Sequence, residues 1–564
     1  MELSPNTGAK LTTSSVPVDH EDGKASSRPQ DDQHLNLNDI YVNMHARQDT
    51  SDIWCESNKM QLLASFPIPD VRRPPQSHRS RGGLLSSSSS SLTVMVDEKE
   101  NNKAGKSQTT LTLTQVASVS SLVSSNTSSR PWLQLLLIHW FSVYRILIGL
   151  VTMVNLVVLA VMIRKNMPYT RFSLAGPLIA TAANIFAAVL MRQEEVINTM
   201  FRIFSLVPLS LPLWFRKTIA DFHHFGGFHI GCAVSALLWY IFVVYLNTAF
   251  FVNGLRKVEA NAWVWADVAT CYSFLISIVL VCVAAHPRFR QRFHNTFERT
   301  HRFGGWIALI VLWINAGVSS RTHGSKPMYL NPAVWLLAVT TFLIILPWLR
   351  MNRVPITATA VSEREVRLSF PYKNMPFLAT MRFSTAPLTE WHAFATVPEP
   401  ETNSAYILIS AAGDWTKKII ANPPKEIFLR HPATLNFLNF APVFSSLLLV
   451  GTGAGIGPLL SLLKSPQMQA MRNSGQTVRV MWSAYNIYAP HWAFVLDIIR
   501  AVDPQPKLFD STKGRADVTF ETVYLMQREC LEAVMIVSNP LVTRQVVEGV
   551  KAKGLPAYGA VFDS

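Results

Sequence analysis

The stretch Val450-Gly451-Thr452-Gly453-Ala454-Gly455-Ile456-Gly457-Pro458 joins a largely apolar run at residues 444–449 to another at residues 459–463. An apolar strand, a glycine-rich turn and a helix start, in this order, are typical of a site that binds the pyrophosphate of a dinucleotide. Glycines let the backbone approach the phosphates, and the unpaired N–H groups of the helix start bind their charge. The stretch therefore predicts a nucleotide-binding loop, although a glycine-rich loop alone has low specificity.

The composition indicates a membrane protein. Of the 564 residues, 49% are hydrophobic and only 15% are charged, which fits an entirely soluble protein poorly. The formal net charge is +15, but the basic residues are scattered or lie beside apolar stretches. This pattern is typical of cytoplasmic loops of membrane proteins, so we expect no nucleic-acid partner.

Changes in composition predict four regions. Residues 1–130 are rich in Ser, Thr, Asn and Asp and predict a disordered cytoplasmic tail, which is either a phosphorylated regulatory arm or a passive extension. Residues 131–352 predict a six-helix transmembrane bundle, residues 353–440 a small antiparallel β-barrel, and residues 441–564 an α/β Rossmann-like domain. The expected fold class is therefore mixed.

Six apolar stretches are each long enough to cross about 30 Å of hydrocarbon. They are residues 146–163, 173–191, 225–251, 264–285, 304–320 and 333–349. Residues 203–215 are also apolar, but this stretch is short and contains two prolines, so we expect it to be interfacial or re-entrant. Both chain ends lie on the same side of the membrane in this arrangement, and more basic residues lie near the membrane on that side than on the other. This difference predicts a multi-pass protein with both termini in the cytoplasm. The particular membrane, plasma membrane or endomembrane, stays open.

Two of the apolar stretches begin with the same histidine motif. Residues 221–228 read Asp-Phe-His-His-Phe-Gly-Gly-Phe and residues 299–306 read Arg-Thr-His-Arg-Phe-Gly-Gly-Trp. The shared pattern predicts His223 and His301 at one depth near the cytoplasmic leaflet, where paired imidazoles can ligate a haem iron. His224 and His229 are weaker candidates because they fall off the helical face that His223 defines. Alternatively, these histidines lie at the interface and bond to headgroups or loop carbonyls.

Further motifs follow in an order that is known from one family. They are His223-His224-Phe225-Gly226-Gly227, His301-Arg302, Trp391-His392-Ala393-Phe394-Ala395-Thr396, Ala412-Gly413-Asp414-Trp415-Thr416, the glycine-rich loop, and Gly514-Arg515-Ala516-Asp517. Together they resemble the ferric reductase and NADPH oxidase superfamily over roughly residues 131–564. The likeness is closest to the fungal TmpA-like integral membrane flavoproteins.

The resemblance implies two cofactor sites in the C-terminal half. The residues implied to bind FAD are His392, Ala393, Phe394, Ala395, Thr396, Gly413, Asp414, Trp415, Thr416 and Phe562. The residues implied to bind NAD(P)H are Gly451, Thr452, Gly453, Ala454, Gly455, Ile456, Gly457, Pro458, Arg515, Ser538, Asn539 and Pro540. Alternatively, residues 412–416 form a plain turn with a buried tryptophan, and Phe562 is simply a packed C-terminal residue.

Three departures from the family pattern limit the resemblance. Where relatives carry the ligands of a second, outer haem, this chain has Leu237 and Asn315, so we expect no outer haem. Ser538 stands where relatives place a cysteine beside the nicotinamide. Tyr485 follows the second predicted strand where NADPH-selective relatives have an arginine, so a preference for NADPH is unsupported.

The resemblance implies a membrane-bound flavin oxidoreductase. Electrons would pass from NAD(P)H through FAD to a single inner-leaflet b-type haem and then to an unknown acceptor: a quinone, a lipid-soluble small molecule or a redox partner protein. The alternative is a regulatory or sensor membrane protein that keeps the flavoreductase scaffold without turnover. A transporter or channel would leave the two C-terminal domains unexplained. No catalytic side chain is predicted.

Overall fold

The computed structural model describes residues 140–165, 173–255, 261–323 and 327–560. The chain divides into two compact units, Met1–Asn58 and Lys59–Ser564, and every described residue lies in the second. The expected tail over residues 1–130 and the expected flavin contact Phe562 lie outside the described residues.

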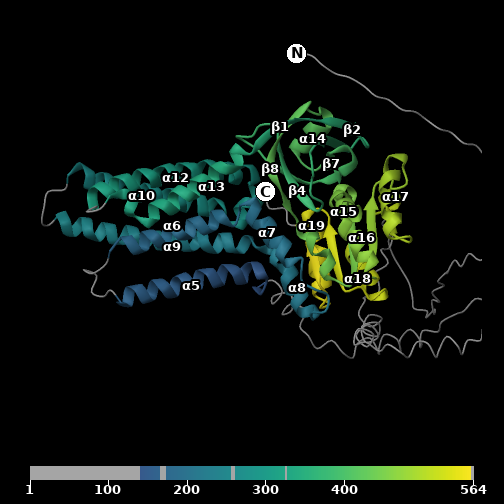
Figure 1. The fold of residues 1–564 in the computed structure, drawn as a ribbon, viewed down its shortest axis with the longest axis horizontal. Helices are drawn as coiled ribbons and strands as arrows, with labels where there is room; N and C mark the ends of the chain where they lie inside the picture. Colours follow the sequence, from purple (N-terminus) through teal and green to yellow (C-terminus); the bar gives the residue numbers. More distant parts are fainter. Residues whose placement is uncertain (1–139, 166–172, 256–260, 324–326, 561–564) are drawn as a thin grey trace, which may run out of the picture. The chain divides into compact units, whose positions relative to one another are not determined.

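Long apolar helices form the first part of the described chain (Figure 1). They are α5 (Val143–Lys165), α6 (Ala175–Leu190), α9 (Gly226–Leu255), α10 (Ala262–Ala284), α12 (His294–His323) and α13 (Pro332–Leu349). Among the described residues, five helices are long and apolar enough to cross a membrane. The sixth candidate, α6, qualifies only together with α7 (Glu194–Phe204), which is bent from it by 68°. A helical part with several candidate spans is therefore present, and the six-helix bundle stays a prediction.

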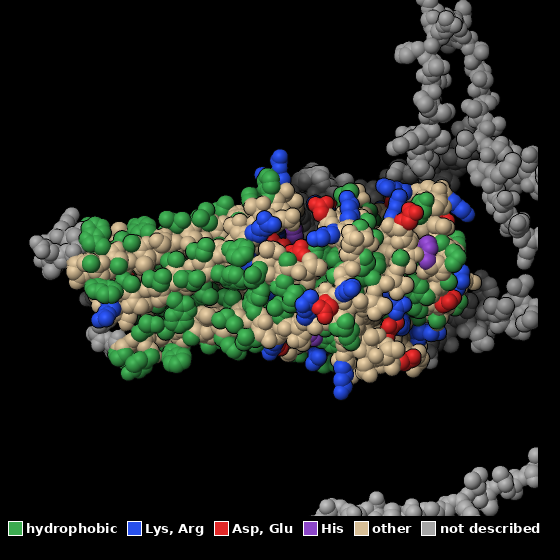
Figure 2. Space-filling model, turned by 90° about the horizontal axis from the view of Figure 1, so that it is seen from above, with side chains coloured by type: hydrophobic (Ala, Val, Ile, Leu, Met, Phe, Trp, Pro, Cys, Tyr) green, Lys and Arg blue, Asp and Glu red, His purple; other side chains and the backbone are tan. Residues whose placement is uncertain are grey.

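The outward faces of these helices are apolar. None of the residues of α5 is buried, and Leu150 and Val157 are 59% and 55% exposed. Hydrophobic side chains cover the helical part on the face that Figure 2 shows, whereas most of the Lys, Arg, Asp and Glu side chains visible there lie over the sheet-containing part. Contact between such a surface and water is unfavourable, whereas contact with the apolar tails of lipids is not. The surface therefore indicates a membrane-embedded part.

Polar side chains inside the helical part are hydrogen-bonded to one another. Asn247 on α9 donates to the Asp267 carboxylate on α10 at 2.9 Å. Asn315 on α12 donates to Thr270 Oγ1 at 3.0 Å. The amide at position 315, where the family would carry an outer haem ligand, thus links α12 to α10, and a polar link of this kind holds helices together in lipid.

Two antiparallel four-stranded sheets follow the helices. Their strand orders are β1-β8-β4-β5 and β2-β3-β7-β6. The strands are β1 (Met351–Pro355), β2 (Thr357–Ala360), β3 (Glu365–Pro371), β4 (Ala379–Ser384), β5 (His392–Ala395), β6 (Val397–Glu399), β7 (Ser404–Ser410) and β8 (Glu426–Leu435). In β3 the alternate residues Val366, Leu368 and Phe370 are buried, as expected for a strand with one face on a core. The expected antiparallel strands are confirmed, and closure into a barrel stays a prediction.

The C-terminal part contains a five-stranded parallel sheet of order β11-β10-β9-β12-β13. The strands are β9 (Ser446–Thr452), β10 (Thr477–Ala484), β11 (Lys507–Asp510), β12 (Ala533–Val537) and β13 (Ala557–Gly559). The helices are α15 (Ile456–Leu463), α16 (Pro466–Asn473), α17 (Ala493–Val502), α18 (Val518–Arg528) and α19 (Pro540–Lys551). All five residues of β12 are buried, which is typical of a central parallel strand. The predicted α/β domain is confirmed.

This strand order creates a binding crevice. Successive strands extend the sheet in one direction from β9 to β11, and the chain then returns to the other side of β9 as β12. In open parallel sheets, ligands bind outside the carboxyl ends of the strands at the point where the order reverses. Here that point lies between β9 and β12, where the glycine-rich loop begins.

Side chains of α7 and α8 (Leu213–Asp221) bind both sheet regions. Asn198 donates to the Ala433 carbonyl at 2.9 Å and accepts from the Leu435 N–H at 2.7 Å. Arg216 forms two hydrogen bonds with the Glu532 carboxylate, at 3.0 and 2.6 Å. The segment between α6 and α9 therefore fixes the helical part against the sheets.

Candidate cofactor site

The glycine-rich loop forms the expected strand, turn and helix. Strand β9 ends at Thr452, a 3₁₀ turn covers Gly453–Gly455, and α15 begins at Ile456. Gly453 has a φ of 52°, a left-handed conformation that favours glycine. A Cβ at position 455 would lie 2.3 Å from the Val537 carbonyl oxygen. Backbone geometry thus requires glycine at both positions.

The loop meets the segment Ser538-Asn539-Pro540 at the crevice. Thr452 Oγ1 and Ser538 Oγ are 2.5 Å apart, so the residue in place of the family's cysteine is hydrogen-bonded to the end of β9. Asn539 caps α19 by accepting from the Val542 N–H at 3.0 Å, and Pro540 opens that helix. Two of the three residues therefore shape the start of α19. Arg515 is exposed and lies between Gly514 and the start of α18.

An unexpected arginine lies beside Tyr485, which follows β10. The Arg364 guanidinium is 5.3 Å from the centre of the Tyr485 ring, and Tyr485 is 61% exposed. Arg364 belongs to the turn between β2 and β3. Nothing in the sequence indicates this contact, because Arg364 reaches Tyr485 from a turn more than a hundred residues earlier in the chain.

The two segments expected to bind flavin lie together. The His392 and Trp415 rings stack with centres 4.1 Å apart, and the Phe394 and Trp415 rings stack at 5.7 Å. Residues Asp414–Ala421 form the helix α14. At its N-terminus, the Gly413 N–H donates to the Thr416 hydroxyl oxygen at 2.9 Å. Residues 413–416 thus begin a helix and do not form a plain turn, and their binding of flavin stays a prediction. Thr396 is buried, and its hydroxyl donates to the Ala379 carbonyl at 3.2 Å.

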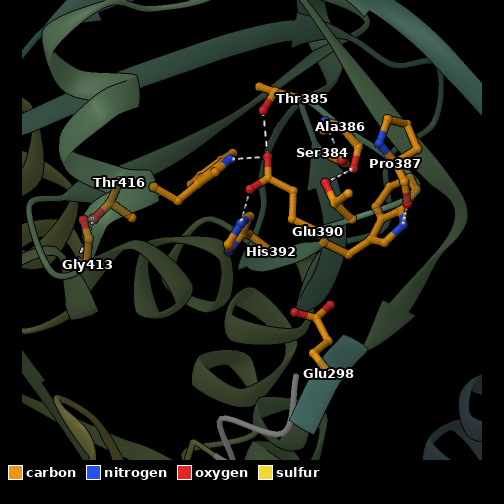
Figure 3. Close-up of polar contacts among 12 residues, drawn as sticks. Glu298, Ser384, Thr385, Ala386, Pro387, Glu390, His392, Gly413 and Thr416 are labelled. Atoms are coloured by element: carbon orange, nitrogen blue, oxygen red, sulfur yellow. Dashed lines mark hydrogen bonds and ion pairs between the residues drawn. The ribbon is translucent and has the colours of Figure 1, made fainter. Parts of the chain in front are cut away.

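Glu390 joins these two segments and was not anticipated from the sequence. Its carboxylate accepts from Thr385 Oγ1 at 2.6 Å and from the Trp415 indole N–H at 2.9 Å, and lies 3.4 Å from His392 Nε2 (Figure 3). Burial raises the pKa of Glu390, but these hydrogen bonds outweigh it, so the pKa lies below its usual value. No motif marks this residue, because its role depends on a fold that brings α14 beside β5.

A cavity of about 1220 Å³ adjoins the expected flavin site. Its volume exceeds the range of about 300–1,000 Å³ that is usual for small-molecule sites, so it can hold part of a dinucleotide. It is lined from all three regions: Thr380, Arg382 and residues 391–395 from the antiparallel sheets, Pro458, Val537 and Ala560 from the parallel-sheet domain, and His223, His224, Gly226 and His294 from the helical part.

The charged side chains that line the cavity are mainly basic. Six cationic side chains contribute, but only one carboxylate, that of Glu548; the cations are Arg145, Arg192, Arg290, Arg382, Arg544 and Lys551. Arg382 and Arg430 flank the buried Glu194 carboxylate on α7 at 3.0 and 2.9 Å. This excess of positive charge suits an anionic occupant such as the pyrophosphate of FAD.

The histidines lie in a different arrangement from the expected one. His223 lies in a 3₁₀ turn, Phe222–His224, that precedes α9, and its ring is 6.0 Å from Phe437 and 5.7 Å from Tyr558. His301 on α12 instead has its ring 6.4 Å from that of His229. His223 is not part of the α-helix, so the helical-face argument that ranked His229 below His223 loses its premise, and the identity of the haem ligands stays a prediction.

The rings of His229 and His301 lie at a distance that suits two ligands of one haem iron. Metal–imidazole bonds of about 2 Å place the centres of two opposed rings roughly 6 Å apart. His229 Nδ1 donates to the Ala188 carbonyl at 2.8 Å, an orientation typical of metal-binding histidines. His301 Nδ1 is buried without a hydrogen-bond partner. A Cβ on Gly305 would meet nothing within 4 Å, so there is open space near His301. No cluster of three or more His, Cys, Asp or Glu able to hold a metal occurs in the described part of the chain.

Comparisons with known proteins give two groups of relatives. Residues 437–564 match the family model "Adenylate-forming reductase 03009, C-terminal domain". Adenylate-forming reductase 03009 of Coprinopsis cinerea is 36% identical over 432 residues, which cover 75% of this chain and 40% of the relative. The chain thus spans about 40% of the length of this relative.

The second group consists of oxidases by name. "Ferric reduction oxidase 8, mitochondrial" of Arabidopsis thaliana is 24% identical over 275 residues, covering 44% of this chain and 36% of the relative. A superoxide-generating NADPH oxidase heavy chain of Dictyostelium discoideum is 25% identical over 245 residues, covering 38% of this chain and 44% of the relative. The finer likeness to TmpA-like proteins stays a prediction. The similarity to the adenylate-forming reductases was not anticipated, and the resemblance to the ferric reductase and NADPH oxidase superfamily is confirmed.

Proposed function

We propose that this chain is a membrane-bound, NAD(P)H-dependent flavin oxidoreductase that contains FAD and one b-type haem. The observation that carries the proposal is one cavity, with six cationic side chains on its wall, that the expected flavin segment, the expected nucleotide domain and the start of α9 line together. A cofactor there lies between a nucleotide crevice and a helical part, which is the order that electron transfer from NAD(P)H into a membrane requires. The similarity to proteins named ferric reduction oxidase and NADPH oxidase supports the same reading.

In this proposal the antiparallel sheets hold the FAD. Residues 392–395 and the basic Arg382 line the cavity, and the His392–Trp415 stack beside Glu390 fixes that segment in place. Arg382 binds the pyrophosphate, since its guanidinium is already held at the cavity by Glu194. Bound FAD would accept a hydride from NAD(P)H and release electrons singly.

The parallel-sheet domain holds NAD(P)H. The loop at residues 451–458 approaches the pyrophosphate through its glycines, and the crevice beside Thr452 and Ser538 receives the nicotinamide end. Pro458 and Val537 line the same cavity as the flavin segment, so the two cofactors can meet there. Arg364 beside Tyr485 offers a cation for the 2′-phosphate that distinguishes NADPH from NADH.

His229 and His301 would hold the haem, which supplies one-electron chemistry within the helical part. Leu237 cannot ligate iron, and Asn315 is engaged with Thr270, so we propose no second haem. The acceptor would then lie within the membrane or on the cytoplasmic side: a quinone, another lipid-soluble molecule or a redox partner protein. Both termini lie in the cytoplasm in this proposal, as the distribution of basic residues predicts.

Cofactor content tests the proposal. The full chain, purified in detergent, is expected to contain FAD and to show haem absorption. His229→Ala and His301→Ala are expected to lose the haem and keep the flavin. His286→Ala is the matched control, because His286 is an exposed histidine beyond the end of α10. A wild-type protein without flavin would contradict the proposal, and haem that survives both substitutions would contradict the ligand assignment.

The alternative is a sensor that binds flavin or nucleotide without turnover. The replacements at Leu237, Asn315 and Ser538 motivate it. Flavin that stays oxidised in the presence of NADH and NADPH would favour it.

A further inference from the structure

A second cavity, of about 550 Å³, lies in the helical part, and its volume is in the range that is usual for small-molecule sites. Its wall comes mainly from α6, α9, α12 and α13 (Figure 1). It shares no lining residue with the cofactor cavity. Asn315 on its wall lies fourteen residues beyond His301 on α12, about 21 Å along the helix axis. This cavity can therefore hold a molecule of its own.

The second cavity has an uncharged wall. None of the described residues that line it is charged, and none is a histidine or a cysteine, so it offers neither an imidazole nor a thiolate to a haem iron. Most of the lining residues are apolar, and Tyr240 and Phe250 add two aromatic rings. Burial of a charged group against such a wall is unfavourable. The occupant is therefore expected to be neutral and largely apolar.

Asn315 supplies a hydrogen-bond acceptor at the wall of the second cavity. The residue is 5% exposed, and its amide nitrogen donates to Thr270 Oγ1 at 3.0 Å. Thr270 Oγ1 donates in turn to the Ala266 carbonyl at 2.8 Å, so it must accept from Asn315, and the NH₂ group of the amide points toward Thr270. Asn315 Oδ1 forms no hydrogen bond with the described residues, although the protein does not enclose it fully. The occupant of the cavity is therefore expected to donate to this oxygen.

Two hydroxyl groups lie near Asn315 on α12. Ser319 follows Asn315 by four residues, a spacing that places both side chains on one face of the helix, and Ser319 and Ser320 both line the cavity. Helical serines commonly donate to the carbonyl four residues earlier, as Ser273 and Ser277 do on α10. The Ser319 and Ser320 hydroxyls form no such bond, nor any other within the described part of the chain. Each can therefore donate to the occupant or accept from it.

We propose that the second cavity binds a quinone or its reduced form, a quinol, through Asn315, Ser319 and Ser320. The ring carbonyls of a quinone accept from the serine hydroxyls, and the ring hydroxyls of a quinol donate to Asn315 Oδ1. A phospholipid headgroup would bury a phosphate with no cation on the described wall. A sterol, with a single hydroxyl, would leave most of these polar groups unbonded. The inference names one class for the unknown acceptor and rests on the proposed function in that respect, whereas the binding itself requires neither FAD nor haem.

The test measures binding of radiolabelled decylubiquinone to the full chain in detergent, with retention by empty micelles subtracted. The wild type is expected to bind it saturably. Ser319→Ala removes a hydroxyl without breaking a hydrogen bond of the described chain and is expected to raise the dissociation constant about two- to tenfold. Ala316→Leu fills part of the cavity and is expected to raise it about tenfold or more. Ser273→Ala and Ala269→Leu carry the same substitutions at exposed positions of α10 and are expected to match the wild type.

Decylubiquinone binding that does not saturate would overturn the inference, and so would unchanged dissociation constants in both Ser319→Ala and Ala316→Leu. Displacement of the quinone by cholesterol, with no effect of Ser319→Ala, would also overturn it, because the cavity would then be a sterol site. Size-exclusion profiles identify a variant that misfolds, and if Ala316→Leu does so, Ser319→Ala carries the test. A wild-type protein without FAD and haem that still binds decylubiquinone saturably would refute the proposed function and support this inference.

Discussion

The nucleotide loop and the start of α9 both place glycines beside residues of expected function, yet only the loop has the predicted arrangement. In the loop, glycine is required by the backbone itself: Gly453 has a positive φ, and a Cβ at position 455 would clash with the Val537 carbonyl. At the start of α9, the predicted pairing of His223 depended on where the helix begins. It begins at Gly226, so His229 lies opposite His301 instead. Local backbone requirements can be read from sequence, whereas partners across a helical part depend on helix starts.

The largest expected effect tests contacts between regions distant in sequence. Glu194 is 2% exposed and pairs with both Arg382 and Arg430. Glu194→Gln leaves two neighbouring guanidiniums without their counter-charge. Breaking a fully buried pair costs about 3–5 kcal/mol, and the cost is lower here because each arginine side chain is about a quarter exposed. We expect a clear fall in the thermal unfolding temperature.

Glu426→Gln is the matched control for Glu194→Gln. Glu426 pairs with Arg353, but both side chains are about half exposed, so its loss is expected to cost at most about 1 kcal/mol. Equal effects of the two substitutions would show that α7 does not anchor the antiparallel sheets.

The next effect tests the local requirement in the loop. Gly455→Ala places a Cβ 2.3 Å from the Val537 carbonyl oxygen, so the loop must move away from β12. Overpacking of this kind costs about 1–3 kcal/mol, and we expect NAD(P)H binding to weaken at least tenfold with FAD binding kept. Gly149→Ala is the control, because a Cβ there meets nothing within 4 Å. Unchanged binding in Gly455→Ala would mean that the loop is not held as described.

A smaller effect concerns pH. Glu390 has a pKa below the usual value of about 4.3 because Thr385, His392 and Trp415 bond to its carboxylate. A carboxyl group whose pKa is lower in the folded than in the unfolded state stabilises the fold at pH values above its unfolded-state pKa. This contribution is lost as the pH falls through its folded-state pKa. The thermal unfolding temperature, measured between pH 7 and about pH 3, is expected to fall less steeply on acidification in Glu390→Gln than in the wild type. Parallel curves would contradict this role.

The smallest effect concerns the bond between Thr452 and Ser538. Its loss in Ser538→Ala or Thr452→Val is expected to cost about 0.5–1.5 kcal/mol in unfolding free energy. The double variant is expected to cost little more than either single one, because both remove the same bond. Additive losses would show that the two hydroxyls act separately. Ser474→Ala, whose exposed hydroxyl bonds only within its own chain segment, is expected to change little.

Much of the C-terminal half could be predicted from the sequence. The glycine-rich loop and the alternation of strands and helices predicted the parallel sheet, and short motifs placed residues 392–396 and 413–416 at one site. The roles of Glu390 and Arg364 could not be predicted, because each side chain contacts a residue of another element, and only the fold brings the two elements together. The bend between α6 and α7 could not be predicted, because hydropathy indicates the length of an apolar stretch and not the direction in which its helix runs. Phe562 and the N-terminal tail lie outside the described residues.

The most direct test of the account is anaerobic reduction of the purified full chain, followed by absorbance. NADH or NADPH is expected to bleach the bound flavin and then to produce the spectrum of reduced haem, because one cavity is lined by the proposed flavin segment, the proposed nucleotide domain and the helical part. Bound flavin that stays oxidised with both nucleotides would contradict the account.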